Sequence, residues 1–423
     1  MTRTLYVFLF DERVGTLQSG QGKLSFTYEP QWLNQTSARA LSLALPLQAE
    51  PFDNEAAQAF FAGLLPEGSL RKLLLRQFQL SDANTLGLLD EIGGECAGAV
   101  SLTTSPDVPS RTMQRQVRWL DDSQLHGVLD ELPNRPMLAG DHEMRLSLAG
   151  AQDKLPVSVQ GNRIGLALNG EPSTHILKPA IASLQDTVFN EAFCMTLAAA
   201  AKLPAAPVQI GHVNGVDYLL VERYDRLLDD SGKHNRLHQE DFCQALGRSS
   251  NSKYQHEGGP DLQDCIQLLR KHTRPAAPNL LQLIDYVLFN ALIGNHDAHA
   301  KNFSLLYQQT VKSGKAWQPT LAPLYDALST AVYPQLSKKM AMKIGSQYTF
   351  KGVMPRHWQQ FASNNQFSPA QLKNRLLSMA RRLPAIAEQV HSENPSWQQS
   401  VVIDAILTLI DERCATTLRR FDM

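Results

Sequence analysis

The chain has little cysteine, and none of it at a spacing that binds metal. Its five cysteines are scattered over 423 residues, their number is odd, and no two form a Cys-x-x-Cys pair. A disulfide-stabilised scaffold or a cysteine zinc site needs paired thiols. The sequence therefore predicts reduced thiols and a cytoplasmic protein.

A strong net charge and a long apolar run are also missing. The net charge is −1 at pH 7, with 43% hydrophobic and 19% charged residues, as in ordinary globular proteins. This balance favours neither nucleic acid nor an anionic membrane as a direct partner. The first apolar run ends at Asp11 and Glu12, so it is not expected to be a signal peptide. No stretch approaches the roughly 20 apolar residues of a membrane span, so we expect no membrane contact.

The length predicts two or three domains. The segments TLYVFLF and KLSFTY are typical of strands, and residues 54–78 are helical in pattern with a break at Pro66-Glu67-Gly68. The stretch TTSPDVPSRTMQRQ, residues 103–116, has two prolines and no apolar period. It predicts a boundary, with a small β-rich N-terminal subdomain over residues 1–105.

Strand patterns return between residues 145 and 225, around a helix predicted over 187–201, and helices dominate after about residue 238. One strongly apolar helix is predicted to begin at an N-cap-like Asn279. Two amphipathic helices are predicted near the C-terminal end, in SPAQLKNRLLSMARRL and SVVIDAILTLIDERCATTLRRF. We therefore expect an α+β chain with a mixed α/β part over residues 106–238 and an all-helical part over 239–423.

Residues 292–307, LIGNHDAHAKNFSLLY, concentrate reactive side chains between two apolar runs. Asp297 and Asn302 are five apart, which is the spacing of the protein-kinase loop H-R-D-x-x-x-x-N. In that loop the aspartate orients the attacking hydroxyl and the asparagine holds Mg²⁺. Lys301, directly before Asn302, is placed to face the transferred phosphoryl group. A metal site or metal nuclease built on His296, Asp297 and His299 is the remote alternative, because single-helix zinc sites use histidines four apart.

Three further elements follow the order found in kinases. Asp326, after an apolar Leu-Tyr pair, suits a second metal carboxylate, although it also suits a helix N-cap. Lys178 ends the strand-like STHILK and suits a phosphate-gripping lysine, although such lysines are commonly solvated. The small-residue turn in RLSLAGAQDKLPVSV, followed by Lys154, could cradle phosphates or form an ordinary hairpin.

Taken together, these motifs resemble the HipA family, the toxin kinases of bacterial toxin–antitoxin modules. The resemblance covers essentially the whole chain and rests on six segments: RLSLAGAQDK, STHILKP, VERYDR, LHQEDFCQALG, GNHDAHAKNFS and PLYDALS. It implies a two-lobed, protein-kinase-like HipA-type fold in which residues 106–238 bind the nucleotide and residues 239–423 form the catalytic lobe.

The resemblance also implies roles for individual residues. Asp297 matches the catalytic aspartate, Asn302 and Asp326 match the Mg²⁺ ligands, and Ser147 matches a regulatory autophosphorylated serine. The residues implied to bind ATP are Ala149, Gly150, Ala151, Gln152, Asp153, Lys154, Lys178, Glu222, Arg223, Tyr224, His299, Lys301 and Tyr325. Arg145 is predicted to hold the Ser147 phosphate when the loop is displaced.

The implied function is a serine/threonine kinase that uses ATP and Mg²⁺. Its implied substrate is an aminoacyl-tRNA synthetase, with glutamyl-tRNA synthetase favoured, and its effect is inhibition of translation and growth. Its implied partner is a HipB-like DNA-binding antitoxin, so that DNA is reached only through that partner. The competing hypothesis is a kinase-like corepressor that acts mainly by binding the antitoxin.

Overall fold

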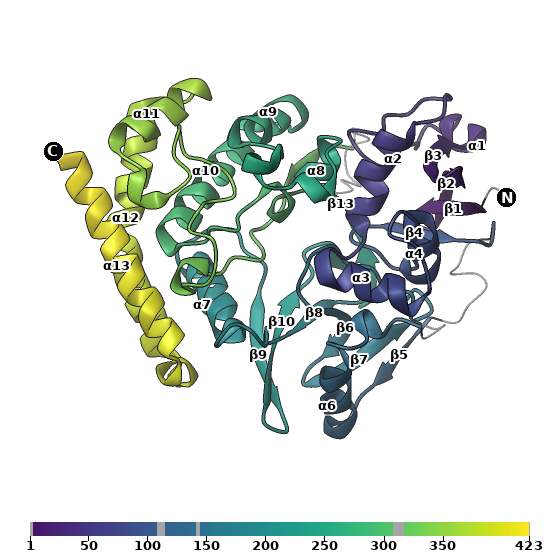
Figure 1. Ribbon diagram of the computed structural model, residues 1–423, viewed down its shortest axis with the longest axis horizontal. Helices are drawn as coiled ribbons and strands as arrows, with labels where there is room; N and C mark the ends of the chain where they lie inside the picture. Colours follow the sequence, from purple (N-terminus) through teal and green to yellow (C-terminus); the bar gives the residue numbers. More distant parts are fainter. Residues whose placement is uncertain (1–2, 108–114, 141–143, 308–316, 423) are drawn as a thin grey trace. The chain divides into compact units, whose positions relative to one another are not determined.

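The computed structural model (Figure 1) describes residues 3–107, 115–140, 144–307 and 317–422. Part of the predicted 103–116 boundary, residues 108–114, lies outside this description. The chain divides into two compact units that are not consecutive in sequence. Unit 1 contains residues 1–179, 211–251 and 305–318, and unit 2 contains residues 180–210, 252–304 and 319–423. The division at residues 105 and 238 stays a prediction.

The first part of unit 1 is an antiparallel sheet of order β3-β2-β1-β4 with short helices. Its strands are β1 (Arg3–Leu9), β2 (Glu12–Gly20), β3 (Lys23–Tyr28) and β4 (Val100–Thr103). Its helices are α1 (Pro30–Leu33), α2 (Asn54–Phe61), α3 (Gly68–Gln77) and α4 (Thr85–Ile92). The predicted break at Pro66-Glu67-Gly68 is confirmed, since it separates α2 from α3. This part has an apolar core of its own, centred on aromatic residues that include Phe26 and Phe60.

A second sheet, of order β5-β7-β6-β8-β10-β9, has a separate core. Its strands are β5 (Gln116–Trp119), β6 (Leu155–Gln160), β7 (Arg163–Leu168), β8 (His175–Pro179), β9 (Val208–Val213) and β10 (Val216–Glu222), with α6 (Asp122–Glu131) after β5. β8 pairs antiparallel with β10, so Lys178 lies opposite Leu219. The short elements β11 (Arg226–Leu228), β12 (His234–Arg236), β13 (His238–Asp241) and α8 (Phe242–Ala245) complete the unit.

Helices build most of unit 2: α7 (Thr187–Ala200), α9 (Leu262–His272), α10 (Ala276–Ile293), α11 (Pro355–Asn364), α12 (Pro369–Glu393) and α13 (Val401–Asp422). Within this unit α12 and α13 run side by side (Figure 1). Two short strands, β14 (Ser304–Tyr307) and β15 (Pro319–Leu321), interrupt the helical part after residue 239. The expectation of an entirely helical part therefore fails at these two segments and at residues 239–241 of β13. The segment FSLLY, which contains β14, has the apolar pattern of a short buried strand.

Helix α10 begins earlier than its sequence suggests. Pro275 is its N-cap, and Asn279 lies in the first turns with its Nδ2 donating to the Pro275 oxygen at 2.9 Å. Its Oδ1 accepts from the Leu321 N–H, so tertiary contacts satisfy an amide that the sequence alone presents as a cap. α10 is long and apolar enough to cross a membrane by length and composition, but 67% of that window is buried inside the protein. All five cysteines are buried, and none of the five forms a disulfide.

Candidate active site

A left-handed glycine turns the chain out of α10 and into the reactive segment, which we name the 294–302 loop. Gly294 is the helix C-cap, with φ of 81°, and its N–H donates to the Asn290 oxygen. A Cβ at this position would lie 2.6 Å from Leu409 Cδ2 and 2.8 Å from Ala331 Cβ. The loop therefore needs glycine for both conformation and space.

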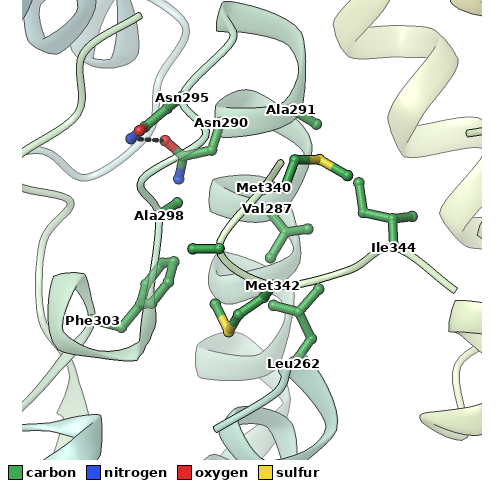
Figure 2. Close-up of a pocket in the computed structure, with 11 residues that line it drawn as sticks. Leu262, Val287, Asn290, Ala291, Asn295, Ala298, Phe303, Met340, Met342 and Ile344 are labelled. Atoms are coloured by element: carbon green, nitrogen blue, oxygen red, sulfur yellow. Dashed lines mark hydrogen bonds between the residues drawn. The ribbon is translucent and has the colours of Figure 1, made fainter. Parts of the chain in front are cut away.

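Two asparagine side chains hold Asp297 in place. Asn295 accepts the Asp297 N–H on its Oδ1 at 3.0 Å and donates from its Nδ2 to Asn290 Oδ1 at 3.0 Å, the dashed contact in Figure 2. Asn302 donates from its Nδ2 to the Asp297 backbone oxygen at 3.0 Å. Asn295 and Asn302 are buried, whereas the Asp297 side chain is 45% exposed. The loop thus presents one accessible carboxylate from a fixed backbone.

A cavity behind the loop is too small for a nucleotide. It has a volume of about 30 Å³, and its lining includes Asn295, Met340 and Met342 (Figure 2). That volume suits about one water molecule, whereas ligand pockets measure roughly 300–1,000 Å³. The cavity belongs to the packing that supports the loop.

His296 is not available as a metal ligand. Its Nδ1 lies 3.1 Å from the Ser337 backbone oxygen, and its Nε2 lies 3.0 Å from the Arg413 guanidinium. Burial, with the positive charge of Arg413, lowers the pKa of this imidazole. A neutral ring that donates on one side and accepts on the other fits both contacts. Among the described residues, no three His, Cys, Asp or Glu side chains form a metal-binding group. The nuclease alternative therefore loses His296, one of its three expected ligands, because both ring nitrogens of this residue are engaged.

The other predicted loop residues brace the backbone. The His299 N–H donates to the Asp297 oxygen at 2.7 Å, and its ring Nε2 lies 4.0 Å from Asp297 Oδ2. Lys301 is buried, and its backbone oxygen accepts from the Tyr325 hydroxyl at 2.7 Å. Tyr325 also shares a hydrogen bond of 2.8 Å with Ser304. These contacts tie the end of the loop to the segment that carries Asp326.

Asn302 and Asp326 have donor chemistry that fits Mg²⁺. Because Asn302 uses its amide nitrogen on Asp297, its amide oxygen is the atom suited to a cation. An amide oxygen and a carboxylate are the hard ligands that Mg²⁺ prefers. Asp326 has φ of 57°, in the left-handed region, and no helix begins there. The N-cap alternative for Asp326 is therefore wrong, since the next helical turn is a 3-10 turn capped at Ser329.

In unit 1, Lys178 is a buried residue of β8, 5% exposed, which excludes a solvated surface charge. Two hydrogen bonds hold the turn of residues 149–154. The Glu67 N–H donates to the Gly150 oxygen at 3.0 Å, and Lys154 Nζ donates to the Ala149 oxygen at 2.8 Å. Gly150 has φ of 117°, a conformation that favours glycine. The same turn contains Ala151, Gln152 and Asp153. Gln152 Nε2 lies 3.4 Å from the Pro179 oxygen. Burial raises the pKa of Asp153, and this effect outweighs the opposing effect of the Lys154 charge.

Ser147 is fully buried. Its Oγ donates to the Leu64 oxygen at 2.7 Å, and its N–H donates to the Glu95 oxygen at 2.8 Å. Arg145 donates from its Nε to the Asp90 backbone oxygen at 3.0 Å, near the end of α4. A kinase cannot reach the Ser147 hydroxyl while these contacts persist.

The predicted hinge, residues 222–224, is only partly suited to ligand contact. Glu222 is exposed at the end of β10, but Arg223 is buried and its guanidinium pairs with Asp225 at 2.8 Å and with Glu95 at 3.3 Å. The Tyr224 hydroxyl donates to the side chain of Gln239. Because the Arg223 side chain is held in an internal ion network, only the backbone of this residue is available to a ligand, and its part in ATP binding stays a prediction.

Sequence reasoning missed Asn295, Tyr254 and Glu95. Asn295 stands inside the quoted motif, and its position two residues before Asp297 is the typical spacing of an asparagine that turns the backbone. Tyr254, whose hydroxyl donates to Asp297 Oδ1 at 2.6 Å, is 43 residues away in sequence. No local pattern marks it or Glu95 for these contacts.

These observations define an α+β chain with a loop that presents one carboxylate. Comparisons with known proteins agree: the HipA N-terminal domain matches residues 5–103, and the HipA-like C-terminal domain matches residues 146–392. The chain belongs to the HipA family.

Its relatives carry kinase names. It is 45% identical over 348 residues to "Putative kinase Y4mE" of Sinorhizobium fredii, covering 82% of this chain and 81% of that protein. It is 30% identical over 404 residues to "Serine/threonine-protein kinase toxin HipA" of Shewanella oneidensis, covering 92% and 90%. A solved structure of the Shewanella oneidensis HipA, HipB and operator DNA complex contains a chain that matches with a TM-score of 0.84 and 26% identity, over 99% of this chain and 98% of that one. The fold is therefore of the HipA type.

Proposed function

We propose that this chain is the toxin of a toxin–antitoxin pair and an ATP- and Mg²⁺-dependent serine/threonine protein kinase. The observation that carries the proposal is the 294–302 loop, which presents the exposed carboxylate of Asp297 from a backbone fixed by Asn295 and Asn302. Membership of the HipA family along most of the chain supports it.

In the proposed reaction, Asp297 orients the acceptor hydroxyl and accepts its proton. Asn302 and Asp326 would hold Mg²⁺, which offsets the charge of the phosphate oxygens when it is bound. Lys178 and the backbone N–H groups of residues 149–154 would bind the phosphates. The backbone of residues 222–224, with Arg223 excluded as a side-chain ligand, would bind the adenine.

The test is the intact mass of the purified protein before and after incubation with ATP and Mg²⁺. Wild type should gain one phosphate, and Asp297→Asn should gain none, because no carboxylate then accepts the hydroxyl proton. Asp404→Asn is the matched control, since it removes an exposed carboxylate of α13 that belongs to none of the predicted site residues. Wild type that starts unmodified and gains nothing would overturn the kinase proposal.

Ser147 is the proposed site of autophosphorylation. Its buried hydroxyl requires residues 145–154 to leave their described position before transfer, and a phosphate of about −1.5 to −2 charge could not return to the Leu64 oxygen. Arg145 would then be released from Asp90 and could hold the phosphate. Phosphorylation would therefore trap the turn away from ATP and end activity. A phosphate mapped to another residue, or a Ser147→Ala protein that is still inactivated by ATP, would contradict this.

The proposed substrate is an aminoacyl-tRNA synthetase, with glutamyl-tRNA synthetase as the first candidate, and the proposed consequence is inhibited translation. The proposed partner is a HipB-like antitoxin, because the structural relative was solved with HipB and operator DNA. A phosphate gain on purified glutamyl-tRNA synthetase would support the substrate. The corepressor function is the second candidate: it predicts that Asp297→Asn retains full antitoxin binding and repression while wild type transfers no phosphate.

A further inference from the structure

Tyr254 contacts the proposed catalytic carboxylate directly. Its hydroxyl donates to Asp297 Oδ1 at 2.6 Å, within the range of short hydrogen bonds from a hydroxyl to a carboxylate. The second oxygen, Oδ2, lies 4.0 Å from His299 Nε2. One carboxylate oxygen is therefore engaged by a phenol, while the side chain as a whole stays 45% exposed.

The Tyr254 backbone is fixed. Its oxygen accepts the N–H groups of Glu257 at 3.0 Å and Gly259 at 2.9 Å. A Cβ at Gly259 would lie 2.3 Å from the Ser252 oxygen, so this turn is closely packed. The phenol is carried by a tight turn and not by an extended segment.

The same turn is bonded to the 294–302 loop through a third segment. The Gln255 N–H donates to the Ala341 oxygen at 3.0 Å, and the Ala341 N–H donates to the His296 oxygen at 2.7 Å. The Tyr254 ring also meets the His299 ring edge to face, with centroids 5.4 Å apart. Tyr254 is thus held relative to Asp297 through backbone and ring contacts alike.

We propose that Tyr254 is a positioning residue for phosphoryl transfer, an inference that rests on the proposed kinase function. Its hydrogen bond to Oδ1 fixes the plane of the carboxylate and leaves Oδ2 for the acceptor hydroxyl. In the transfer, the hydroxyl oxygen forms the new bond to the γ-phosphorus, the bond to ADP breaks, and the hydroxyl proton passes to Oδ2. Without the phenol, the carboxylate rotates about its Cβ–Cγ bond and the acceptor loses its orientation.

The test compares Tyr254→Phe with Tyr348→Phe. Both variants remove one phenol hydroxyl, and the ring of Tyr348 lies 6.1 Å from that of His256, beside the Tyr254 ring, so the control sits in the same aromatic group. The measurements are the single-turnover rate of phosphate gain by intact mass, the dissociation constant for ATP and the melting temperature. Tyr254→Phe should lower the rate roughly tenfold, as expected for a misaligned general base, with ATP affinity and melting temperature unchanged. Tyr348→Phe should match wild type in all three.

The outcomes separate the inference from the function it rests on. If wild type transfers no phosphate, the kinase function fails and the inference falls with it. If wild type is active and Tyr254→Phe is equally fast, the phenol does not position Asp297. A faster Tyr254→Phe would mean that the phenol blocks the carboxylate, and phosphate mapped to Tyr254 would mean that it is an acceptor. The last three outcomes overturn the positioning role while leaving the kinase function intact.

Discussion

Replacing Glu95 by glutamine should destabilise unit 1 through an ion network that is wholly internal. Glu95 Oε1 lies 2.8 Å from Arg226 and 3.3 Å from Arg223, and it also accepts from the Ser173 hydroxyl at 2.9 Å. Asp225 balances the two arginines from the other side, and the four charged side chains are each only 2% exposed. Two buried cations thus face two buried carboxylates.

The magnitude follows from this charge count. Glutamine keeps the shape of Glu95 but leaves two guanidinium groups facing the single carboxylate of Asp225. Breaking one side of a buried ion pair costs about 3–5 kcal/mol, because the remaining charge stays desolvated. Burial alone would raise the pKa of Glu95, but Arg236, Arg226 and Arg223 outweigh it and leave that pKa below its usual value. The stability that Glu95 supplies is therefore present above the pKa of the unfolded carboxyl and is lost as pH falls.

The assay is urea unfolding at pH 7 and at pH 4, with amide exchange measured in residues 93–98 and 223–226. Glu95→Gln should lower the free energy of unfolding at pH 7 by about 3–5 kcal/mol, and by less at pH 4. Glu50→Gln, at an exposed position of the same unit, should change it by less than about 0.5 kcal/mol. A Glu95→Gln protein that matches this control at pH 7 would refute the reasoning.

Three smaller perturbations follow from the same structure. Burial raises the pKa of Glu240 to about 7, so the folded state keeps a proton above pH 4.5 that the unfolded chain loses, and the free energy of unfolding falls as pH rises toward 7. Glu240→Gln should remove about 3 kcal/mol of this loss between pH 5 and pH 8, and pH profiles of melting temperature that are equal for wild type and variant would contradict it. Gly294→Ala should lower the free energy of unfolding by about 2 kcal/mol or more, because alanine must adopt φ of 81° with its Cβ against Leu409. Thermal unfolding measures this loss, and Gly127→Ala, whose added Cβ meets open space, is the control. Asn295→Ala should lower the free energy of unfolding by about 1–3 kcal/mol, because the Asp297 N–H loses its acceptor, and it should slow phosphate gain. A variant that gains phosphate at the wild-type rate would show that the loop does not depend on Asn295.

Elements set by local pattern were predicted closely. The strands TLYVFLF and KLSFTY are β1 and β3, the helix predicted over 187–201 is α7, and the two amphipathic C-terminal helices are α12 and α13. Period-two and helical apolar patterns are local properties of the chain, so neighbouring residues suffice to reveal them. The start of α10 was predicted wrongly, because the Asn279 amide is satisfied by Leu321 from 42 residues away.

The sequence by itself determined the family, the order of the motifs and the candidate residues, since these depend on residue identity, on spacing within short segments and on the order of those segments along the chain. Tertiary structure alone decided which of those side chains are free to act. It placed Arg223 in a buried ion network, enclosed Ser147 beneath the Leu64 carbonyl and set the Tyr254 phenol against Asp297. The physical reason is that a buried charge or hydrogen-bonding group needs a partner, and the chain supplies that partner from segments remote in sequence.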